Sequence, residues 1–561
     1  MSDRLLEKAG GWWRRLRSMP GDGMRGALRV SCGVAALVLV MALPLALRKK
    51  GEEHTAAARQ LVVITPNNEA IRYEFERAFR EYHRLRHGGE EVSVDWRTIG
   101  GTSEIVRYIR STYAAVFQHD WLKAHPEAPW NDRIAEAVFR DSTTAQGDPP
   151  AYAARQAFLA GETSIGIDVF WGGGQYDMEA LTRAGMTVPM GVRSRHPEWF
   201  AGDPPVMSSG GGGEIWYDVS DCYYATCFAC FGIISNRDRL RDAGFTSVQT
   251  AQFGRSWRDL ADARLYGAVG LADPTQSGSI VKCFEMIIQR EMQDTVARLC
   301  PAGEEPGPEQ LNLAWRNAMT LLKRIGGNAA YLTFSASKVP VDAATGQIAA
   351  GMCIDFYGRS QAEWEARASG RRTVEYCTPA GASSVSAEPV AIMRGAPDRA
   401  LAEEFVDFLL SPAAQRLYAR RAGEAGGTVK YTLYRLPCRR DLYTAGERAA
   451  ATFGAEDPFR MAGDFRYRGE WTGRLFSLMR VLIKVMLIDC GPELRDSCGR
   501  IIRRGGLEAL SVPEREAFEA LPFEHSEAAG ILAAADTPEK QAALLREWIS
   551  FFRDNYRRVA P

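Results

Sequence analysis

The residues that point most clearly to chemistry form a small polar turn, Thr275-Gln276-Ser277-Gly278-Ser279. An apolar stretch before the turn predicts a short buried strand, and apolar residues spaced three and four apart after it predict a helix that begins near Gly278. Backbone N–H groups at a helix N-terminus lack partners and carry partial positive charge. Because Gly278 admits a ligand to the backbone and the Ser277 and Ser279 hydroxyls can add hydrogen bonds, the turn from Thr275 onward predicts an anion site. The alternative is an ordinary helix cap, in which Ser and Thr are common.

Three other predicted strands end in similar small or polar residues. The strands span residues 61–65, 92–99 and 165–171, and each precedes a predicted helix. In α/β folds, ligands bind at the carboxyl ends of the strands. The candidate ligand-binding residues at these ends are Asn67, Asn68, Thr102, Ser103, Gly172 and Gly173. The two asparagines have the alternative role of helix caps, and the glycines can serve close backbone packing instead.

The composition is that of a globular protein with more than one domain. The 561 residues include 69 basic and 69 acidic side chains, with no basic block that would indicate nucleic-acid binding. Eleven cysteines are scattered along the chain. Cys227 and Cys230 form a CxxC pattern inside an apolar run with no second pair, which favours buried structural thiols over zinc or redox chemistry. Disulfides remain open as an alternative for an oxidising compartment.

The N-terminal region predicts a membrane anchor. Residues 1–29 are rich in arginine, and the next 18 residues, Val30–Leu47, contain no charge. A helix of that length spans about 27 Å, enough to cross a bilayer core. The basic excess before this segment predicts a cytoplasmic N-terminus and a main domain outside the inner membrane. A cleaved signal peptide and a buried core helix are the alternatives.

The order of predicted elements indicates an α/β fold in two lobes. Strands alternating with helices predict parallel sheets covered on both faces. We expect lobe 1 at residues 61–215, with a helical insertion at 116–160, and a crossing segment and lobe 2 at 216–385. A return crossing with further helices follows at 386–438. Residues 439–561 read as a mainly helical C-terminal extension whose role no pattern assigns.

Seven segments, in order, resemble the ferric-type extracellular solute-binding proteins of ABC importers, which have the type II periplasmic-binding fold. The segments are LVVITPNNEAIRYEFERAF, GGTSEIVRYIR, DVFWGGG, FGIISN, LADPTQSGS, GQIAAGMCIDFYGRSQAE and SAEPVAIMRGAPDRALAEEFVDFLLSPAAQRLYA. The resemblance covers roughly residues 61–421. It implies two α/β lobes joined by a strand hinge that close over a small solute in the cleft between them.

The resemblance also implies a set of site residues. Iron-binding members of the family hold ferric iron with a histidine, a glutamate and two adjacent tyrosines, and they hold an anion on a Ser-Gly turn. Glu104 matches the glutamate and Tyr357 matches one tyrosine, so these two residues are the candidate metal ligands, and Asp355 is a third anionic group nearby. The position of the second tyrosine is Phe356, and the histidine position is Asn67 or Asn68.

Ser277, Gly278 and Ser279 match the family's anion turn. Three identities of the solute therefore remain as alternatives: ferric iron with a synergistic anion, an iron chelate, or a different small anionic or polar molecule.

These observations predict the solute-binding component of an ABC importer, whose partners are a small solute and the permease subunits in the membrane. The chain lacks the GxxxxGK[ST] pattern of a nucleotide-binding loop, so a separate subunit is expected to hydrolyse ATP. It also lacks GxSxG and HExxH motifs, which argues against an enzyme. The alternative is a membrane-tethered sensory receptor that uses the same fold to detect a solute.

Overall fold

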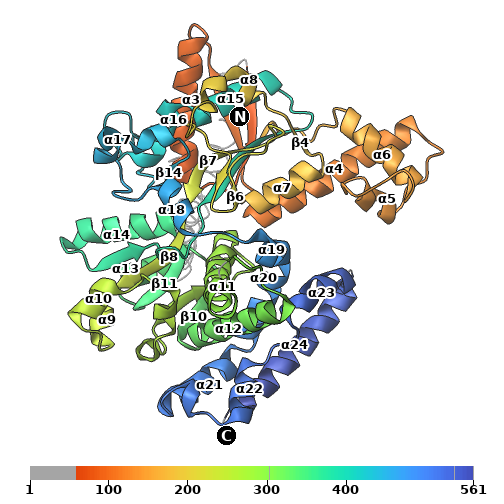
Figure 1. The fold of residues 1–561 in the computed structure, drawn as a ribbon. Coiled ribbons are helices and arrows are strands. Elements are labelled where there is room, and N and C mark those ends of the chain that lie inside the picture. The colour runs from red at the N-terminus through yellow and green to blue at the C-terminus, as the bar shows by residue number, and fades with distance from the viewer. Residues whose placement is uncertain (1–58, 302, 536, 560–561) are drawn as a thin grey trace, which may run out of the picture. The chain divides into compact units, whose positions relative to one another are not determined.

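The computed structural model describes residues 59–301, 303–535 and 537–559 (Figure 1). The predicted basic segment 1–29 and the predicted anchor 30–47 lie outside these residues. In the described part, no helix combines the length and the apolar character needed to cross a membrane. The chain divides into two units, Met1–Arg59 and Gln60–Pro561, and the elements below belong to the second.

Lobe 1 is built on a seven-stranded sheet with the order β14-β7-β13-β3-β1-β2, in which β4 also pairs with β13. Its strands are β1 (Arg59–Ile64), β2 (Val92–Arg97), β3 (Val169–Trp171), β4 (Thr187–Val188), β7 (Tyr224–Ala229), β13 (Ser386–Met393) and β14 (Leu436–Pro437). Its helices are α3 (Glu69–Arg86), α4 (Thr102–Ala124), α5 (Asp132–Ala137), α6 (Pro149–Ala160), α7 (Gln175–Arg183), α8 (Val192–Arg195), α15 (Arg399–Leu410) and α16 (Pro412–Ala419). A small hairpin of β5 (Gly210–Gly211) and β6 (Glu214–Ile215) lies beside this sheet.

Both faces of the lobe 1 sheet are covered, as the element order predicts. Along β13, Val390 and Ile392 belong to one apolar cluster, and Ala391 and Met393 belong to another. The first cluster includes α3, α15 and α16, and the second includes α4, α6 and α7. The alternation follows from the two-residue period of a strand. The predicted helical insertion consists of the second half of α4 with α5 and α6, which project as an arm at the right of Figure 1.

Lobe 2 is built on a five-stranded sheet with the order β10-β9-β11-β8-β12. Its strands are β8 (Phe231–Asn236), β9 (Val269–Ala272), β10 (Ala329–Thr333), β11 (Ala350–Ile354) and β12 (Val374–Cys377). Its helices are α9 (Arg237–Asp242), α10 (Ser247–Gln252), α11 (Gly278–Leu299), α12 (Pro308–Gly327), α13 (Lys338–Ala344) and α14 (Asp355–Ser369). The predicted strand and helix around the polar turn are confirmed as β9 and α11.

The chain crosses between the lobes twice. The apolar segment after residue 216 contains β7 in the first sheet and β8 in the second, with only Cys230 between them. The return path runs from β12 to β13 through residues 378–385. The two crossings touch, because the backbone N–H of Phe231 donates to Oγ of Ser383 at 2.9 Å.

The predicted parallel pairing holds for part of each sheet, but both sheets are mixed. β1 and β3 are parallel, as are β9, β10 and β11, but β13 is antiparallel to β3 and β7, and β8 is antiparallel to β11 and β12. The reason is that the crossing strands enter each sheet from the other lobe, without the helical connection that parallel neighbours require.

Most of the C-terminal helices pack on lobe 2 (Figure 1, lower part), but the first two lie against lobe 1. The C-terminal helices are α17 (Ala445–Ala449), α18 (Pro458–Asp464), α19 (Gly469–Thr472), α20 (Phe476–Lys484), a π-helix (Val485–Asp489), α21 (Gly491–Arg503), α22 (Val512–Glu519), α23 (Ala528–Ala534) and α24 (Pro538–Arg558). Trp471, Leu482 and Trp548 share one apolar core with α11 and α12. At Gly327 the approach is so close that an added methyl carbon would lie 2.2 Å from Sγ of Cys498. Only glycine fits there.

The cysteines of the described part are free thiols. All ten are unbonded, and eight of them are buried. Burial raises the pKa of both Cys227 and Cys230 well above its ordinary value, which keeps these thiols protonated. Their interpretation as core residues is confirmed.

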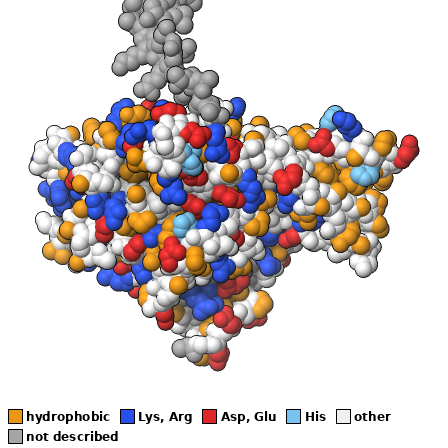
Figure 2. All heavy atoms as spheres, turned by 90° about the horizontal axis from the view of Figure 1, so that it is seen from above, with side chains coloured by type: hydrophobic (Ala, Val, Ile, Leu, Met, Phe, Trp, Pro, Cys, Tyr) orange, Lys and Arg blue, Asp and Glu red, His pale blue; other side chains and the backbone are white. Residues whose placement is uncertain are grey.

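Basic and acidic side chains are interspersed on the face seen in Figure 2. This mixture agrees with the equal numbers of the two kinds in the sequence.

Candidate functional site

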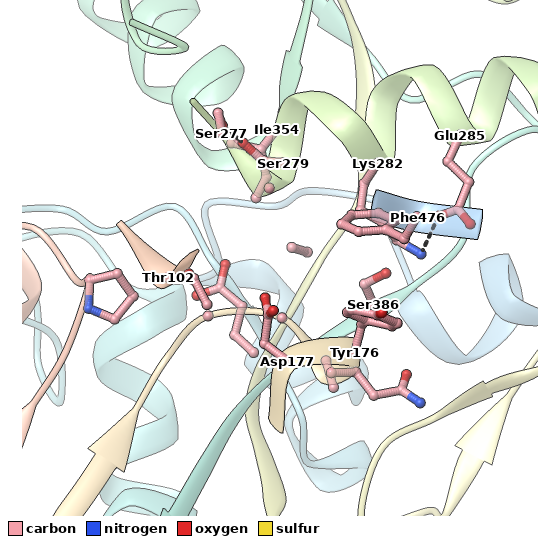
Figure 3. A pocket seen from close by; sticks show the side chains of 18 of the residues that line it. Thr102, Tyr176, Asp177, Ser277, Ser279, Lys282, Glu285, Ile354, Ser386 and Phe476 are labelled. Carbon is pink, nitrogen blue, oxygen red and sulfur yellow. Dashed lines mark hydrogen bonds and ion pairs between the residues drawn. The ribbon is translucent and has the colours of Figure 1, made fainter. Parts of the chain in front are cut away.

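A cavity of about 590 Å³ is lined by both lobes and by the C-terminal helices (Figure 3). Most of the predicted site residues lie on its wall. Those that line it are Asn67, Asn68, Thr102, Ser103, Glu104, Gly173, Thr275, Ser277, Gly278, Ser279 and Tyr357. Two predicted residues, Gly172 and Asp355, are not among its lining residues. The chain therefore gathers strand-end residues more than 250 positions apart at one place.

The polar turn leaves the start of α11 open. The Asp273 carboxylate folds back on the turn and accepts hydrogen bonds from the backbone N–H and the hydroxyl of Thr275, both at 2.7 Å. Ser277 occupies the N-cap position, but no side chain caps α11, and its hydroxyl instead lies 3.0 Å from that of Ser279. The first N–H groups of α11 therefore keep their capacity to bind a ligand, as an anion site requires.

Among the helices that begin at this cavity without a side-chain cap are three with predicted site residues or their neighbours in the first turn, α4, α7 and α11. Two of them carry their own carboxylate in the first turn, Glu104 in α4 and Asp177 in α7. Such carboxylates offset the positive end of the helix. The first turn of α11 has no acidic residue. Of the three, α11 is consequently the helix whose N-terminal field is free for an anionic ligand.

An arginine from the C-terminal region stands beside the α11 turn. Nη1 of Arg480 donates to Oγ of Ser103 at 2.8 Å, and an added methyl carbon at Gly278 would lie 3.7 Å from Nη2. The guanidinium thus links α4 of lobe 1 to the beginning of α11 in lobe 2. Asp177 faces the same charge: burial raises the pKa of its carboxyl, and Arg480 and Arg110 counteract part of that rise.

A half-buried lysine lies on the cavity wall (Figure 3). Nζ of Lys282 lies 3.1 Å from Oε1 of Glu214 in lobe 1 and 3.0 Å from Oε2 of Glu285, one turn along α11. Burial by itself lowers the pKa of Lys282, but the two carboxylates and Tyr467 raise it well above its ordinary value. Glu214 also accepts from the Ser386 hydroxyl at 2.9 Å. This cluster joins the lobes through the ion pair between Lys282 and Glu214.

Asn67, Asn68 and Gly172, which follow strands of lobe 1, make structural contacts there. The Asn68 side chain caps α3 by accepting from the N–H of Ile71, which confirms the capping role. Asn67 donates to the Trp171 carbonyl at 3.4 Å, and an added methyl carbon at Gly172 would lie 3.0 Å from its Nδ2. Gly172 therefore lies behind Asn67, which explains why it does not reach the cavity.

Of the residues that follow β11, some stabilise lobe 2 and others line the cavity. Asp355 is buried and pairs with Arg359 at 3.0 Å, so its carboxylate is engaged inside lobe 2 and does not line the cavity. Tyr357 lines the cavity, and burial raises the pKa of its phenol. Phe356 lies under the Arg435 guanidinium, 3.9 Å from its ring centre, and Arg435 is paired with Glu388.

Sequence reasoning missed several lining residues, among them Asp177, Lys282, Arg435, Tyr467 and Phe476. Lys282 lies one helical turn after Ser279 and Asp177 lies in the first turn of a predicted helix, so helix periodicity would have found both. Tyr467, Phe476 and Arg480 come from the C-terminal region, where nothing in the local sequence marks a binding role.

Comparison with known proteins shows a family. The family model described as "Bacterial extracellular solute-binding protein" matches residues 142–423. A search of curated proteins found no match to this chain.

Three solved structures are similar in fold, each at low identity. Iron-bound HitA from Pseudomonas aeruginosa is 13% identical, with a TM-score of 0.44 and coverage of 76% of this chain and 99% of that one. The periplasmic binding protein AfuA from Actinobacillus pleuropneumoniae, with exogenous fructose-6-phosphate bound, is 16% identical, with a TM-score of 0.41 and coverage of 72% and 88%. The spermidine/putrescine-binding PotD from Streptococcus pneumoniae is 12% identical, with a TM-score of 0.44 and coverage of 76% and 99%.

Proposed function

Since the chain belongs to the bacterial extracellular solute-binding protein family, we propose that it captures a small solute with an anionic group in the cavity between its lobes. The observation that carries this proposal is the beginning of α11. Its N-terminus has no side-chain cap and no acidic residue in its first turn, and it opens onto a cavity lined by both lobes. A carboxylate, phosphate or phosphonate group on this turn would accept from backbone N–H groups and from the Ser277 and Ser279 hydroxyls.

The opposite wall suggests what the rest of the solute carries. Glu104 and Asp177 line the cavity from lobe 1, and in the described part of the chain neither carboxylate forms an ion pair with a lysine or arginine. Carboxylates of this kind accept from hydroxyl or amino groups. The solute class that fits both walls is therefore a small polar molecule with an anionic group at one end and hydrogen-bond donors at the other.

Ferric iron, alone or as a chelate, is the second candidate solute. Glu104, Asp177 and Tyr357 offer oxygen atoms from both lobes to the same cavity. Against bare iron, burial raises the pKa of Tyr357 and so disfavours the phenolate that iron coordination uses. The prediction of Glu104 and Tyr357 as metal ligands stays open to a direct test.

Capture would proceed by closure of the lobes around the two crossing segments. A solute that contacts α11 in lobe 2 and α4 in lobe 1 stabilises the closed arrangement by its higher affinity for that state. The closed protein would then deliver the solute to the permease subunits of an ABC importer. Residues 30–47 would tether the chain to the inner membrane, with the main domain on the outer side.

The test is a binding measurement on the full chain with chemically distinct solutes. A thermal-shift screen with sugar phosphates, phosphonates, amino acids, polyamines and ferric citrate selects the class, since a ligand raises the melting temperature by mass action. Calorimetry with the best solute should then show binding weakened at least tenfold by the double change Ser277→Ala and Ser279→Ala, because two hydrogen bonds to a charged group are lost.

A matched control uses the second Ser-x-Ser pair of lobe 2. The hydroxyls of Ser335 and Ser337 also lie 3.0 Å apart, and neither residue lines the cavity. Alanine at both positions should leave the affinity unchanged. Equal affinity for the wild type and the Ser277/Ser279 variant would contradict the anion site, and a response to polyamines alone would contradict an anionic solute.

A further inference from the structure

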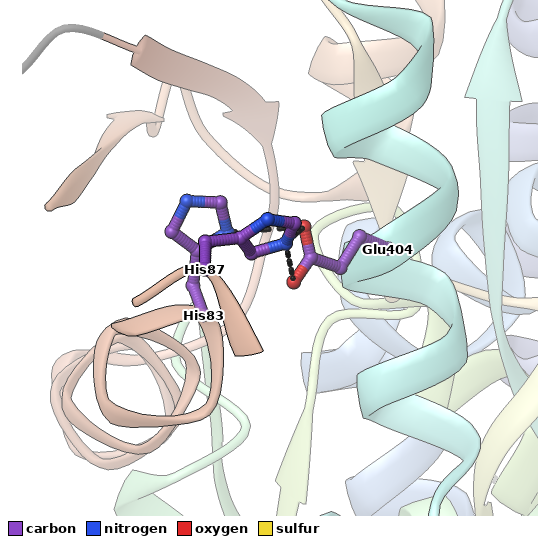
Figure 4. Close-up of side chains that lie close together, drawn as sticks. All are labelled: His83, His87 and Glu404. Carbon is purple, nitrogen blue, oxygen red and sulfur yellow. Dashed lines mark hydrogen bonds and ion pairs between the residues drawn. The ribbon is translucent and has the colours of Figure 1, made fainter. Parts of the chain in front are cut away.

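Three side chains with metal-ligand chemistry meet on lobe 1, away from the cavity (Figure 4). His83 lies in the last turn of α3, His87 follows at its C-cap, and Glu404 faces them from α15. Nδ1 of His83 lies 3.0 Å from Oε2 of Glu404. Nε2 of His87 lies 3.1 Å from both carboxylate oxygens. The three potential ligand atoms all lie within 4.8 Å of one another.

The two imidazoles are held in place by the helix and its neighbours. A spacing of four residues puts both rings on one face of α3. The ring centres lie 4.3 Å apart, with the two planes tilted by 30°. The His83 side chain has no exposed surface, and its Nε2 is buried with no hydrogen-bond partner. All polar contact of this ring is therefore directed through Nδ1 toward Glu404.

The carboxylate of Glu404 differs from the other acidic groups of its helix. Glu403 pairs with Arg195 and Arg399, and Asp407 pairs with Arg195. Glu404, with only 14% of its side chain exposed, has no lysine or arginine partner among the ion pairs of the described residues, and both of its ion-pair contacts are to histidine. When those rings are neutral, the carboxylate has no fixed positive charge beside it. A divalent cation would supply one.

The donor set suits zinc in particular. Two imidazole nitrogens and one carboxylate oxygen are protein ligands of Zn²⁺, with bond lengths of about 2.0 to 2.2 Å. In a tetrahedral site such bonds place neighbouring ligand atoms about 3.4 Å apart. The observed separations of 3.0 and 3.1 Å require the carboxylate to move back by only a few tenths of an ångström.

We propose that His83, His87 and Glu404 form a site for one divalent cation of the zinc class, with water in the fourth position. The bound ion joins the end of α3 to α15. Because none of the three residues lines the cavity, the site is separate from solute capture and does not depend on the solute proposed above.

The experiment uses the full chain, free of any histidine tag and stripped with a chelator, titrated with Zn²⁺ alone by calorimetry. The wild type should bind one equivalent and melt at a higher temperature with the ion. The same protein with Co²⁺ should develop the visible absorption of a low-coordinate site. His87→Ala should weaken Zn²⁺ binding at least tenfold. Glu404→Gln, which keeps the shape of the side chain and removes its charge, should do the same.

A matched control separates this site from general binding by surface histidines. His125 is exposed at the C-cap of α4, and its Nδ1 contacts the Trp121 carbonyl at 3.2 Å. His125→Ala should bind Zn²⁺ like the wild type. The proposal is overturned if the wild type binds no more tightly than His87→Ala, or if Glu404→Gln retains full affinity. Circular dichroism verifies that each variant is folded, and His87 is exposed enough for the change to be tolerated.

Discussion

Two lysines with little exposed surface allow a comparison of the cleft with the interface between lobe 2 and the C-terminal helices. Lys282, on the wall of the cavity, is flanked by the carboxylates of Glu214 and Glu285. Lys323, on the buried side of α12, donates instead to the carbonyls of Phe518 and Ala520, at 2.6 and 2.8 Å. Burial lowers the pKa of Lys323 to about 7, whereas the carboxylates overcome burial at Lys282 and raise its pKa.

This difference between the two lysines indicates that the cleft can open, whereas the interface between α12 and the C-terminal helices stays closed. Contacts between lobe 1 and the opposite wall of the cleft include the polar pairs Lys282–Glu214 and Arg480–Ser103, beside the ring contact between Tyr176 and Phe476. Charged and hydroxyl groups regain water when such a surface opens. The C-terminal helices meet α12 through an apolar core, into which Gly327 admits Cys498. We infer that α19 to α24 move with lobe 2 as one body and carry Arg480 and Phe476 to the cleft.

Removing the cleft lysine should have the largest effect. Lys282→Met keeps the length and apolar volume of the side chain but leaves two buried carboxylates without their counter-charge. Loss of one partner from a buried ion pair costs about 3 to 5 kcal/mol. The expected result is a decrease of that size in the free energy of unfolding, measured by urea denaturation at pH 7, together with loss of solute binding.

A compensated variant provides the control for that experiment. Adding Glu214→Gln and Glu285→Gln to Lys282→Met removes the unpaired negative charges and should restore most of the stability. If Lys282→Met alone were as stable as the wild type, the carboxylates would not depend on the lysine, and the comparison between the two regions would fail.

The interface lysine should make stability depend on pH. Its folded pKa, about 7, lies below the ordinary value of about 10.4 for an unfolded lysine. Below pH 7 the group is protonated in both states and the full cost of burying its charge applies. As pH rises from 7 toward 10 the folded state has lost the proton while the unfolded state still holds it, so the cost falls. The wild type should therefore gain stability relative to Lys323→Met over this window, by up to about 1.4 kcal/mol per pH unit.

Urea denaturation of the wild type and Lys323→Met at pH 7, 8 and 9 measures that gain. Other groups that titrate here, such as the buried thiol of Cys498, are present in both proteins and cancel in the difference. The lost hydrogen bonds to Phe518 and Ala520 add an offset that does not change with pH. Parallel stability curves for the two proteins would show that Lys323 stays charged in the interface.

Much of the fold followed from the sequence because local signals agreed with tertiary packing. Asn68 marks the start of α3, and the apolar period after Gly278 marks α11, since each pattern reflects one helix and the face it buries. The resemblance to extracellular solute-binding proteins is confirmed by the family match, and this family and fold are those of solute-binding proteins rather than enzymes. The antiparallel pairing of β8 and β13 was not foreseen, because strand direction is set by partners far along the chain.

The site was predictable only in part, because some of its contacts also join residues far apart along the chain. Strand-end residues such as Thr102 and Ser277 converge on one cavity, as expected for ligand sites in α/β folds. Asp355 does not line it, since its charge partner Arg359, four residues on, holds the carboxylate inside lobe 2. Arg480 could not be assigned, because its contact with Ser103 joins residues 377 positions apart and leaves no trace in either local sequence.

The smallest expected effect comes from that contact, and it tests whether the C-terminal region holds the cleft closed. Ser103→Ala removes the acceptor for Arg480, and a typical intramolecular hydrogen bond contributes about 1 kcal/mol net. Closure should become about fivefold less favourable, so hydrogen–deuterium exchange at the start of α4 should rise about fivefold while exchange in α21 and α24 stays unchanged. Ser111→Ala, on the same helix but bonded only to the Tyr108 carbonyl, should alter neither region. A double-mutant cycle with Arg480→Met measures the coupling energy between Arg480 and Ser103. A coupling energy near zero would mean that this hydrogen bond does not restrain the lobes. A coupling energy of about 1 kcal/mol would establish that Arg480, carried by the C-terminal helices on lobe 2, holds lobe 1 in the closed arrangement.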